Sequence, residues 1–141
     1  MALIAEYLLL LARDSDAAGL QSYEATDFLV YRRGIDVRSA LVLWQIGVIG
    51  ERSIKREAGA WNRAGLAVLA EVLAAHYGGT HEAVVYQAAS NALCDPAIER
   101  MPLASLASAR VSAIATLYVP PSEAPVADET MLLRLGMSSP G

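Results

Sequence analysis

The feature that most constrains this chain is an apolar run at residues 40–48, interrupted only by Gln45. The run has the length of a strand, and near-continuous apolar character is typical of a strand buried on both faces. Gly47 and Gly50 then bracket a turn. In open α/β sheets, ligands bind just beyond the carboxyl end of such a strand, because backbone groups that leave the ladder are free to bond something else. Residues 40–48 therefore predict a central strand with a candidate site at its end.

Two further runs have strand length, β-branched residues and breakers at both ends, namely residues 83–87 and 112–119. Pro120 and Pro121 end the second run, since proline cannot donate to a ladder. Helices are expected at residues 22–32, 60–77 and 103–111, the last entered after Pro102. This alternation predicts an α/β fold: a single domain with a mixed sheet flanked by helices.

Local signals place the ends of the first two helices. Ser22 is the expected cap of helix 22–32, with Arg32 and Arg33 in its last turn before Gly34. Helix 60–77 carries one apolar stripe and is expected to end at Gly78-Gly79. The stripe consists of Trp61, Gly65, Val68, Leu69, Val72, Leu73 and His76. Glu51 and Lys55 have the spacing of an ion pair on an exposed helical turn.

Both ends of the chain differ from this middle part, residues 21–120. Residues 1–20 predict an apolar helix followed by an acidic turn, and residues 121–141 a proline-containing extended tail with one helical turn near Met131–Leu135. The N-terminal run is too short to span a bilayer and lacks the positive start of a signal peptide. Its apolar residues surround the helix, so we expect it to bind a partner or a second copy, or to close a bare sheet face. They are Leu3, Ile4, Tyr7, Leu8, Leu10 and Leu11.

Composition narrows the classes of partner. A net charge of −4 without a basic stripe argues against nucleic acid and anionic membranes. The single cysteine, Cys94, permits no internal disulfide and fits the reducing cytoplasm. Hydrophobic residues make up 55% of the chain and charged residues 18%, which indicates apolar surface covered by a partner.

Few residues offer catalytic or metal chemistry. With two histidines and no neighbouring cysteine, a metal site is not expected, and His76 and His81 are interpreted as structural residues. Two polar residues stand out, Gln45 and Gln87, each at the end of an apolar strand. A buried amide there must be hydrogen-bonded, either by a neighbouring loop or by a polar ligand in a cleft. The residues alone leave both alternatives open.

Three motifs carry a family resemblance that runs from about Gln21 to Gly136. They are Trp44-Gln45-Ile46-Gly47, Tyr86-Gln87-Ala88-Ala89 and Ala115-Thr116-Leu117-Tyr118-Val119. Together with the segment 21–30, they resemble the second half of the tetrapyrrole-methylase superfamily, in particular the branch related to the borosin peptide backbone N-methyltransferases. Those enzymes use S-adenosylmethionine.

The resemblance implies a C-terminal domain that forms one wall of a cofactor cleft. It implies cofactor contacts from Trp44, Gln45, Ile46, Gly47, Tyr86, Gln87, Ala88, Ala115 and Thr116, with the adenosine at the carboxyl ends of three neighbouring strands. Nothing before Gln21 resembles the family's N-terminal domain, and no catalytic residue is assigned. The methyl acceptor could be a peptide amide or a tetrapyrrole-like precursor.

Three hypotheses follow from this partial resemblance. The chain is the C-terminal half-module of a methyltransferase that is inactive without a partner N-terminal half. Alternatively, it is a non-catalytic paralogue that dimerises or binds peptides, or a precursor-like protein with a substrate tail at residues 122–141. The third hypothesis is a fragment of a longer enzyme. Fold alone does not decide among them.

Overall fold

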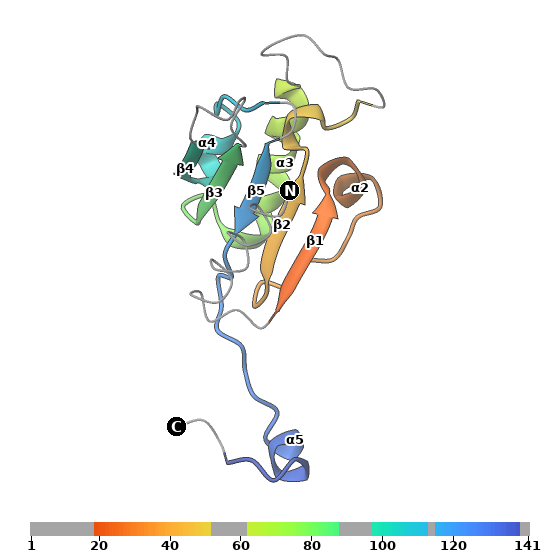
Figure 1. The fold of residues 1–141 in the computed structure, drawn as a ribbon, viewed down its shortest axis with the longest axis vertical. Helices are drawn as coiled ribbons and strands as arrows, with labels where there is room; N and C mark the ends of the chain where they lie inside the picture. The colour runs from red at the N-terminus through yellow and green to blue at the C-terminus, as the bar shows by residue number, and fades with distance from the viewer. Residues whose placement is uncertain (1–18, 52–61, 88–96, 113–114, 139–141) are drawn as a thin grey trace, which may run out of the picture.

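A computed structural model of the chain describes residues 19–51, 62–87, 97–112 and 115–138. Within these ranges, one five-stranded mixed sheet is flanked by helices, which confirms the predicted fold class (Figure 1). The elements are β1 Leu20–Glu24, α2 Ala25–Val30, β2 Ala40–Trp44, the 3₁₀ helix η1 Ile46–Val48, α3 Arg63–Tyr77, β3 Glu82–Gln87, β4 Ala97–Pro102, α4 Leu103–Leu106, β5 Thr116–Val119 and α5 Glu129–Arg134.

The spatial order of the strands is β1-β2-β5-β3-β4. β1 and β2 run parallel, joined by a crossover through α2, as neighbouring parallel strands require. The β2–β5, β5–β3 and β3–β4 pairs are antiparallel. β2 and β3 therefore point toward one end of the sheet, and β5, which lies between them, runs the opposite way.

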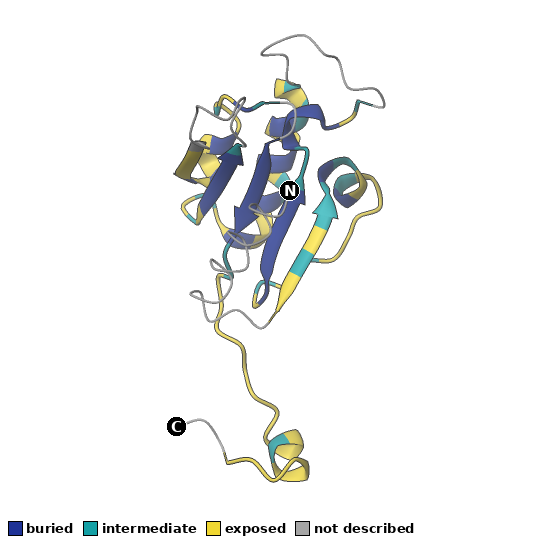
Figure 2. Ribbon diagram, viewed as in Figure 1, coloured by how far each residue is buried: buried dark blue, intermediate teal, exposed yellow. Residues whose placement is uncertain are grey.

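The main core lies between one face of the sheet and the helices. Leu41 and Leu43 of β2 and Leu117 of β5 pack there with the buried stripe of α3, which includes Leu66, Leu69 and Leu73. On the opposite face, Ala40, Val42, Val84 and Tyr118 form a second buried cluster with Trp44 at its border. The centre of the sheet is thus buried on both faces, as the run at 40–48 predicts, whereas β1 and β4 are partly exposed (Figure 2).

The predicted helix at 22–32 is wrong over its first part. Residues 20–24 form β1, in register with all of β2, and only Ala25–Val30 are helical. Glu24 rather than Ser22 caps α2, because its carboxylate accepts a hydrogen bond of 2.9 Å from the Asp27 N–H. Pairing with a buried parallel strand therefore outweighs the local helix signal of this segment.

The end of α2 also differs from the prediction. Arg32, with a φ of 47°, adopts the left-handed conformation after the cap, and Gly34 does not have a positive φ. The Arg33 N–H bonds the Phe28 carbonyl at 3.2 Å, closing the turn around Arg32. This is the hydrogen-bond pattern of a Schellman motif, in which the left-handed residue is usually glycine. Arginine takes that position here.

The other elements differ from the predictions in four respects. The predicted helix at 103–111 shrinks to α4, four residues long, and the preceding segment 97–102 is a strand that the sequence reading missed. The apolar run at 40–48 contains β2 only as far as Trp44, followed by η1. The strand predicted at 112–119 is described from Thr116 to Val119. β4 has no apolar alternation to reveal it, and its pairing along all of β3 defines it.

The long helix is confirmed as α3 and ends at Gly78, with a φ of 90°. Its buried face is rotated from the predicted stripe: Leu66, Ala70 and Tyr77 join Leu69 and Leu73, while Val68 and His76 are exposed. Some predictions concern residues that the structure does not describe: the predicted N-terminal apolar helix, Lys55, Trp61, Ala88 and Cys94. In the tail, the expected helical turn forms as α5, but none of its residues is buried and it stands apart from the sheet (Figures 1 and 2).

Candidate functional site

Strand ends from three neighbouring strands meet at one end of the sheet. β2 and β3 end there at Trp44 and Gln87, and β5 begins there at Thr116. We call this place the strand-end edge: Trp44, Gln45, Ile46, Gly47, Tyr86, Gln87, Ala115 and Thr116. The three sequence motifs of the predicted site are thus neighbours in space. Ala88 of the predicted set lies outside the described residues.

Backbone contacts join these motifs directly. The Ile46 N–H donates to the Ala115 carbonyl at 3.1 Å, and Thr116 pairs with Tyr86 across the β5–β3 ladder. The expectation that all three strands end here is wrong for β5: being antiparallel, it contributes its amino end. The residues meet nevertheless, since in an antiparallel neighbour the start of one strand lies beside the end of the next.

The turn after β2 is held by three hydrogen bonds. Asn62, the cap of α3, donates its backbone N–H to the Gly47 carbonyl at 2.8 Å and its side-chain amide to the Ile49 carbonyl at 2.7 Å. The Gly50 N–H bonds the Thr26 hydroxyl at 3.0 Å. Sequence reasoning did not assign Asn62 or Thr26, although an asparagine before an apolar helical stripe is a recognisable cap signal.

Gly65 allows the close approach of this turn to α3. A Cβ built at Gly65 would lie 2.8 Å from the Ile49 carbonyl oxygen and 2.9 Å from the Ile49 Cβ. Both distances are below van der Waals contact, so any larger residue would push the turn away from the helix. This glycine in the first turn of α3 thereby lets the turn after β2 pack closely against the helix.

Gln45 has an unusual backbone conformation. Its φ of 58° and ψ of 46° are left-handed, a region that non-glycine residues visit rarely and at a cost of about 1–3 kcal/mol. Its side chain is partly exposed and forms no hydrogen bond with another described residue. Strained backbone conformations of this kind cluster at ligand-binding sites. Gln45 therefore presents an amide whose donors and acceptor are not engaged by the described protein.

Gln87 is in the opposite situation. Its Nε2 donates to the Arg110 carbonyl at 3.2 Å, and its Oε1 accepts from the Ser112 N–H at 2.7 Å. Both ends of the amide are therefore used to tie the chain that leads into β5 to the end of β3. Of the two alternatives that the sequence left open for the glutamines, the neighbouring loop describes Gln87.

Trp44 borders the second cluster of the sheet. Its indole N–H donates to the Ser22 hydroxyl on the paired strand β1, and its ring packs against the cluster formed by Ala40, Val42, Val84 and Tyr118. The ring is half-buried, so part of its surface stays open beside Gln45. An anchored indole with one open side can cover the face of a flat ligand.

Another polar side chain considered from the sequence, His81, makes contacts within the fold. His81 Nε2 forms a 2.7 Å hydrogen bond with the Pro120 carbonyl, and its ring stacks on Tyr77 at 5.1 Å between centroids. Burial, with a smaller contribution from the Asp36 carboxylate, raises the pKa of Tyr77 to about 12. Within the described ranges, no group of three His, Cys, Asp or Glu side chains could hold a metal ion, and no helix has the length and apolar character to cross a bilayer.

Comparison with known proteins gives a consistent set of relatives. The chain is 37% identical over 109 residues to a methyltransferase/ribosomally synthesized cyclic peptide gymnopeptides precursor of Gymnopus fusipes. It is 31% identical over 132 residues to the omphalotin A precursor of Omphalotus olearius, and 34% identical over 112 residues to a type I borosin precursor of Coprinopsis marcescibilis. Its relatives are borosin-type methyltransferase precursors. No protein-family model matches the chain.

The alignments cover most of this chain but only a small part of each relative. The alignments cover 74%, 91% and 77% of this chain, but only 26%, 31% and 29% of those three relatives. The chain thus spans less than a third of the length of the relatives that it matches. The borosin branch named from the sequence is the one that these relatives represent.

Proposed function

We propose that this chain is the C-terminal half-module of a peptide backbone N-methyltransferase of the borosin type, dependent on S-adenosylmethionine. In this proposal, the strand-end edge forms one wall of the cofactor cleft, and an N-terminal methyltransferase half supplies the other wall. The observation that carries the proposal is the meeting of three motifs at one end of the sheet, where the Gln45 amide at the end of β2 is not engaged by another described residue. The relatives, which are named as methyltransferases, support the reaction class.

The residues of the edge suit a nucleoside. The open side of the Trp44 ring can cover a purine face, and the Gln45 amide offers both a donor and an acceptor to its polar edge. The turn is fixed by Asn62 and Thr26, so it need not become ordered when ligand binds. S-adenosylmethionine would supply the methyl group, and this chain's residues would bind and orient the adenosine end.

Methyl transfer also requires a positioned acceptor and control of its proton. At the strand-end edge, the polar side chains are the amides of Gln45 and Gln87, an indole, the Tyr86 phenol and a threonine hydroxyl, and none is a carboxylate, imidazole or amine. We therefore assign the acceptor-binding and proton-handling groups to the partner half. A peptide acceptor follows from the relatives; their kinship with the wider tetrapyrrole-methylase superfamily is part of the same proposal.

Calorimetric titration with S-adenosylhomocysteine tests the proposal. We expect measurable binding when the chain is mixed with the N-terminal half of a borosin-type methyltransferase, and weak or no binding to either half alone. Gln45→Ala should weaken binding to the complex several-fold, as loss of a neutral hydrogen bond of about 0.5–1.5 kcal/mol predicts, with little change in melting temperature. Binding that is unaffected by Gln45→Ala would remove Gln45 from the site.

A second candidate function rests on the tail. The segment from Ser122 to Ser138 is almost entirely exposed, and the relatives are named as fusions of a methyltransferase with a peptide precursor. In this alternative, the chain is a precursor-like protein whose residues 122–141 are the substrate. Mass spectrometry after incubation with an active borosin methyltransferase distinguishes the two: increments of 14 Da in tail peptides favour the precursor role.

A further inference from the structure

A cavity lies away from the strand-end edge, between α2 and the second half of α3. It has a volume of about 400 Å³, and its lining consists of Phe28, Leu29, Arg32, Arg33, Gly34, Val72 and His76. The volume is within the range of small-molecule sites, which begins near 300 Å³. Neither the strand-end edge nor the proposed methyl transfer involves these residues.

The lining is divided between apolar and polar side chains. Phe28 is buried, and Leu29 and Val72 are half-buried, so their side chains provide an apolar wall. Arg32, Arg33 and His76 are exposed around it. Apolar walls with a few convergent polar groups are the usual construction of a ligand site.

The two arginines have no acidic partner in the described part of the chain. The ion pairs found there join Arg38 to Glu123 and Arg100 to Glu82, each at 3.7 Å. The Arg33 guanidinium instead lies 5.9 Å from the Tyr23 ring centroid and 5.7 Å from that of Tyr31. Two aromatic faces position this cation without neutralising it, so its charge is available to an anion.

Arg32 gives the second, independent observation. It occupies the left-handed position that ends α2, where glycine would be favoured by about 1 kcal/mol. The backbone therefore does not explain an arginine at this position, and what the side chain adds is a second guanidinium at the cavity. Guanidinium groups bind carboxylates with two parallel hydrogen bonds.

The geometry points to a binding site for a carboxylate carried on an apolar body, with the body against Phe28, Leu29 and Val72 and the carboxylate at Arg32 and Arg33. Such a group can come from a small free acid or from an acidic–apolar peptide segment. The chain itself contains one example: α5 starts with Asp128 and Glu129 and exposes Met131 and Leu133.

Calorimetric titration of the full chain with octanoate tests the site, with octanamide and acetate as matched probes. Octanamide keeps the apolar body without the charge, and acetate keeps the charge without the body. We expect saturable binding of octanoate and at least about tenfold weaker binding of octanamide, since a charge-assisted hydrogen bond is worth about that factor. Acetate should also bind at least about tenfold more weakly, because it lacks the apolar body, worth about 0.8 kcal/mol per buried CH₂. Equal binding of octanoate and octanamide, or no saturable binding of octanoate, overturns the assignment.

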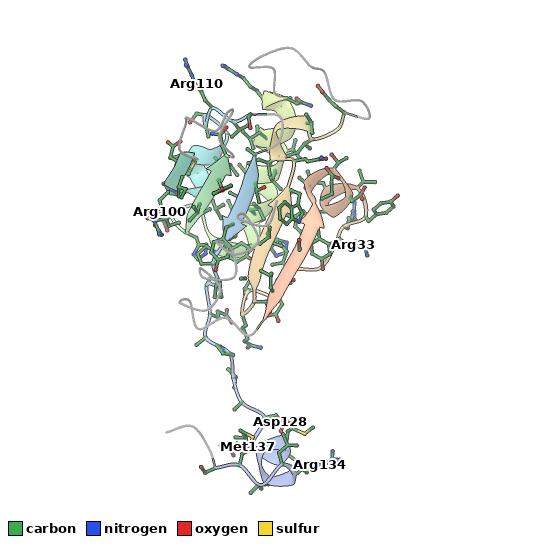
Figure 3. The ribbon with its side chains drawn as sticks, in the orientation of Figure 1. Arg33, Arg100, Arg110, Asp128, Arg134 and Met137 are labelled. Atoms are coloured by element: carbon green, nitrogen blue, oxygen red, sulfur yellow. The ribbon has the colours of Figure 1, made fainter. Side chains whose placement is uncertain are left out.

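Arg32→Gly separates binding from folding. Glycine suits the left-handed backbone, so the melting temperature should stay the same or rise, while octanoate affinity should fall about tenfold. Arg100→Gln is the control, because Arg100 lies on β4 at the opposite edge of the sheet from Arg33 (Figure 3). Unchanged affinity in Arg32→Gly, or an equal loss in Arg100→Gln, contradicts the proposal.

Glu129→Gln assigns the natural source of the carboxylate. The Asp128 carboxylate caps α5 by accepting a hydrogen bond from the Met131 N–H, so Glu129 is the carboxylate of α5 that is left for the arginines. If Glu129 occupies the cavity, its removal should raise the apparent affinity for octanoate, because a competitor is lost. An unchanged affinity assigns the cavity to a free acid.

Discussion

The ends of β2 and β3 each place a glutamine at the same edge of the sheet, yet the two side chains do different things. Gln87 uses both ends of its amide to hold the chain between Arg110 and Ser112. Gln45 has a left-handed backbone and no hydrogen bond from its side chain to another described residue. The comparison teaches that one residue type at equivalent strand exits can serve the fold in one case and remain available to a ligand in the other.

Replacing Gln87 should produce the largest effect. Gln87→Ala removes two hydrogen bonds and leaves the partly buried Ser112 N–H without its acceptor, so we expect the free energy of unfolding to fall by about 2 kcal/mol. Urea denaturation measures this loss. Gln87→Glu, which keeps the acceptor for Ser112 but not the donor, should recover part of the stability. A wild-type midpoint in Gln87→Ala would mean that the loop contacts contribute little.

Gly65→Ala tests the support of the Gln45 exit. The added methyl group meets the backbone of Ile49, and overpacking costs about 1–3 kcal/mol, partly offset by about 1 kcal/mol of better helix propensity. We expect a net loss near 1 kcal/mol in urea denaturation, with weaker binding of S-adenosylhomocysteine by the assembled enzyme. Ala75→Gly, at an exposed position of α3, reports the propensity term alone. A stabilised Gly65→Ala variant would show that the turn can move.

Gln45→Gly should change the free energy of unfolding in the opposite direction from Gln87→Ala. Glycine removes the cost of the left-handed conformation, so we expect the free energy of unfolding to rise by about 0.5–1 kcal/mol while cofactor affinity falls. Thermal unfolding and calorimetry on the same preparation measure both quantities. Destabilisation by Gln45→Gly would mean that the side chain supports the fold, which would place Gln45 with Gln87.

Tyr77 provides a reference for a buried polar group without a partner. Its hydroxyl is buried and has no hydrogen-bond partner in the described structure, so Tyr77→Phe should raise the free energy of unfolding by about 1 kcal/mol near neutral pH, because it removes an unsatisfied buried polar group. At alkaline pH the two proteins should diverge further. The pKa of Tyr77 is raised to about 12, so the unfolded chain loses this proton first and the wild type loses stability between about pH 10 and 12.

Denaturation series at several pH values measure that divergence. In the Tyr77→Phe variant, the part of the alkaline loss that is due to this group should be missing. Parallel stability profiles for the two proteins would show that the hydroxyl titrates as it does in the unfolded chain.

The sequence predicted the parts of the fold whose signals are local and strong. The apolar run that contains Ala40–Trp44 predicts a buried strand, and Gly78 ends α3 because it adopts a positive φ. The meeting of the three motifs at one end of the sheet could also be predicted, because they follow or begin strands, and strands that pair in one sheet bring their ends together. These features follow from side-chain patterning over a few residues, which the sequence contains in full. The ligand contacts of the three motifs stay a prediction.

Tertiary structure decided what depends on partners distant in the sequence. Residues 20–24 are a strand because β2 lies beside them, and β4 exists because β3 offers it a complete ladder. The direction of β5 and the contrast between Gln45 and Gln87 are of the same kind. A strand edge and an amide gain their hydrogen-bond partners only when segments ten or more residues away arrive. Local propensity, worth less than about 1 kcal/mol per residue, does not determine which segments arrive.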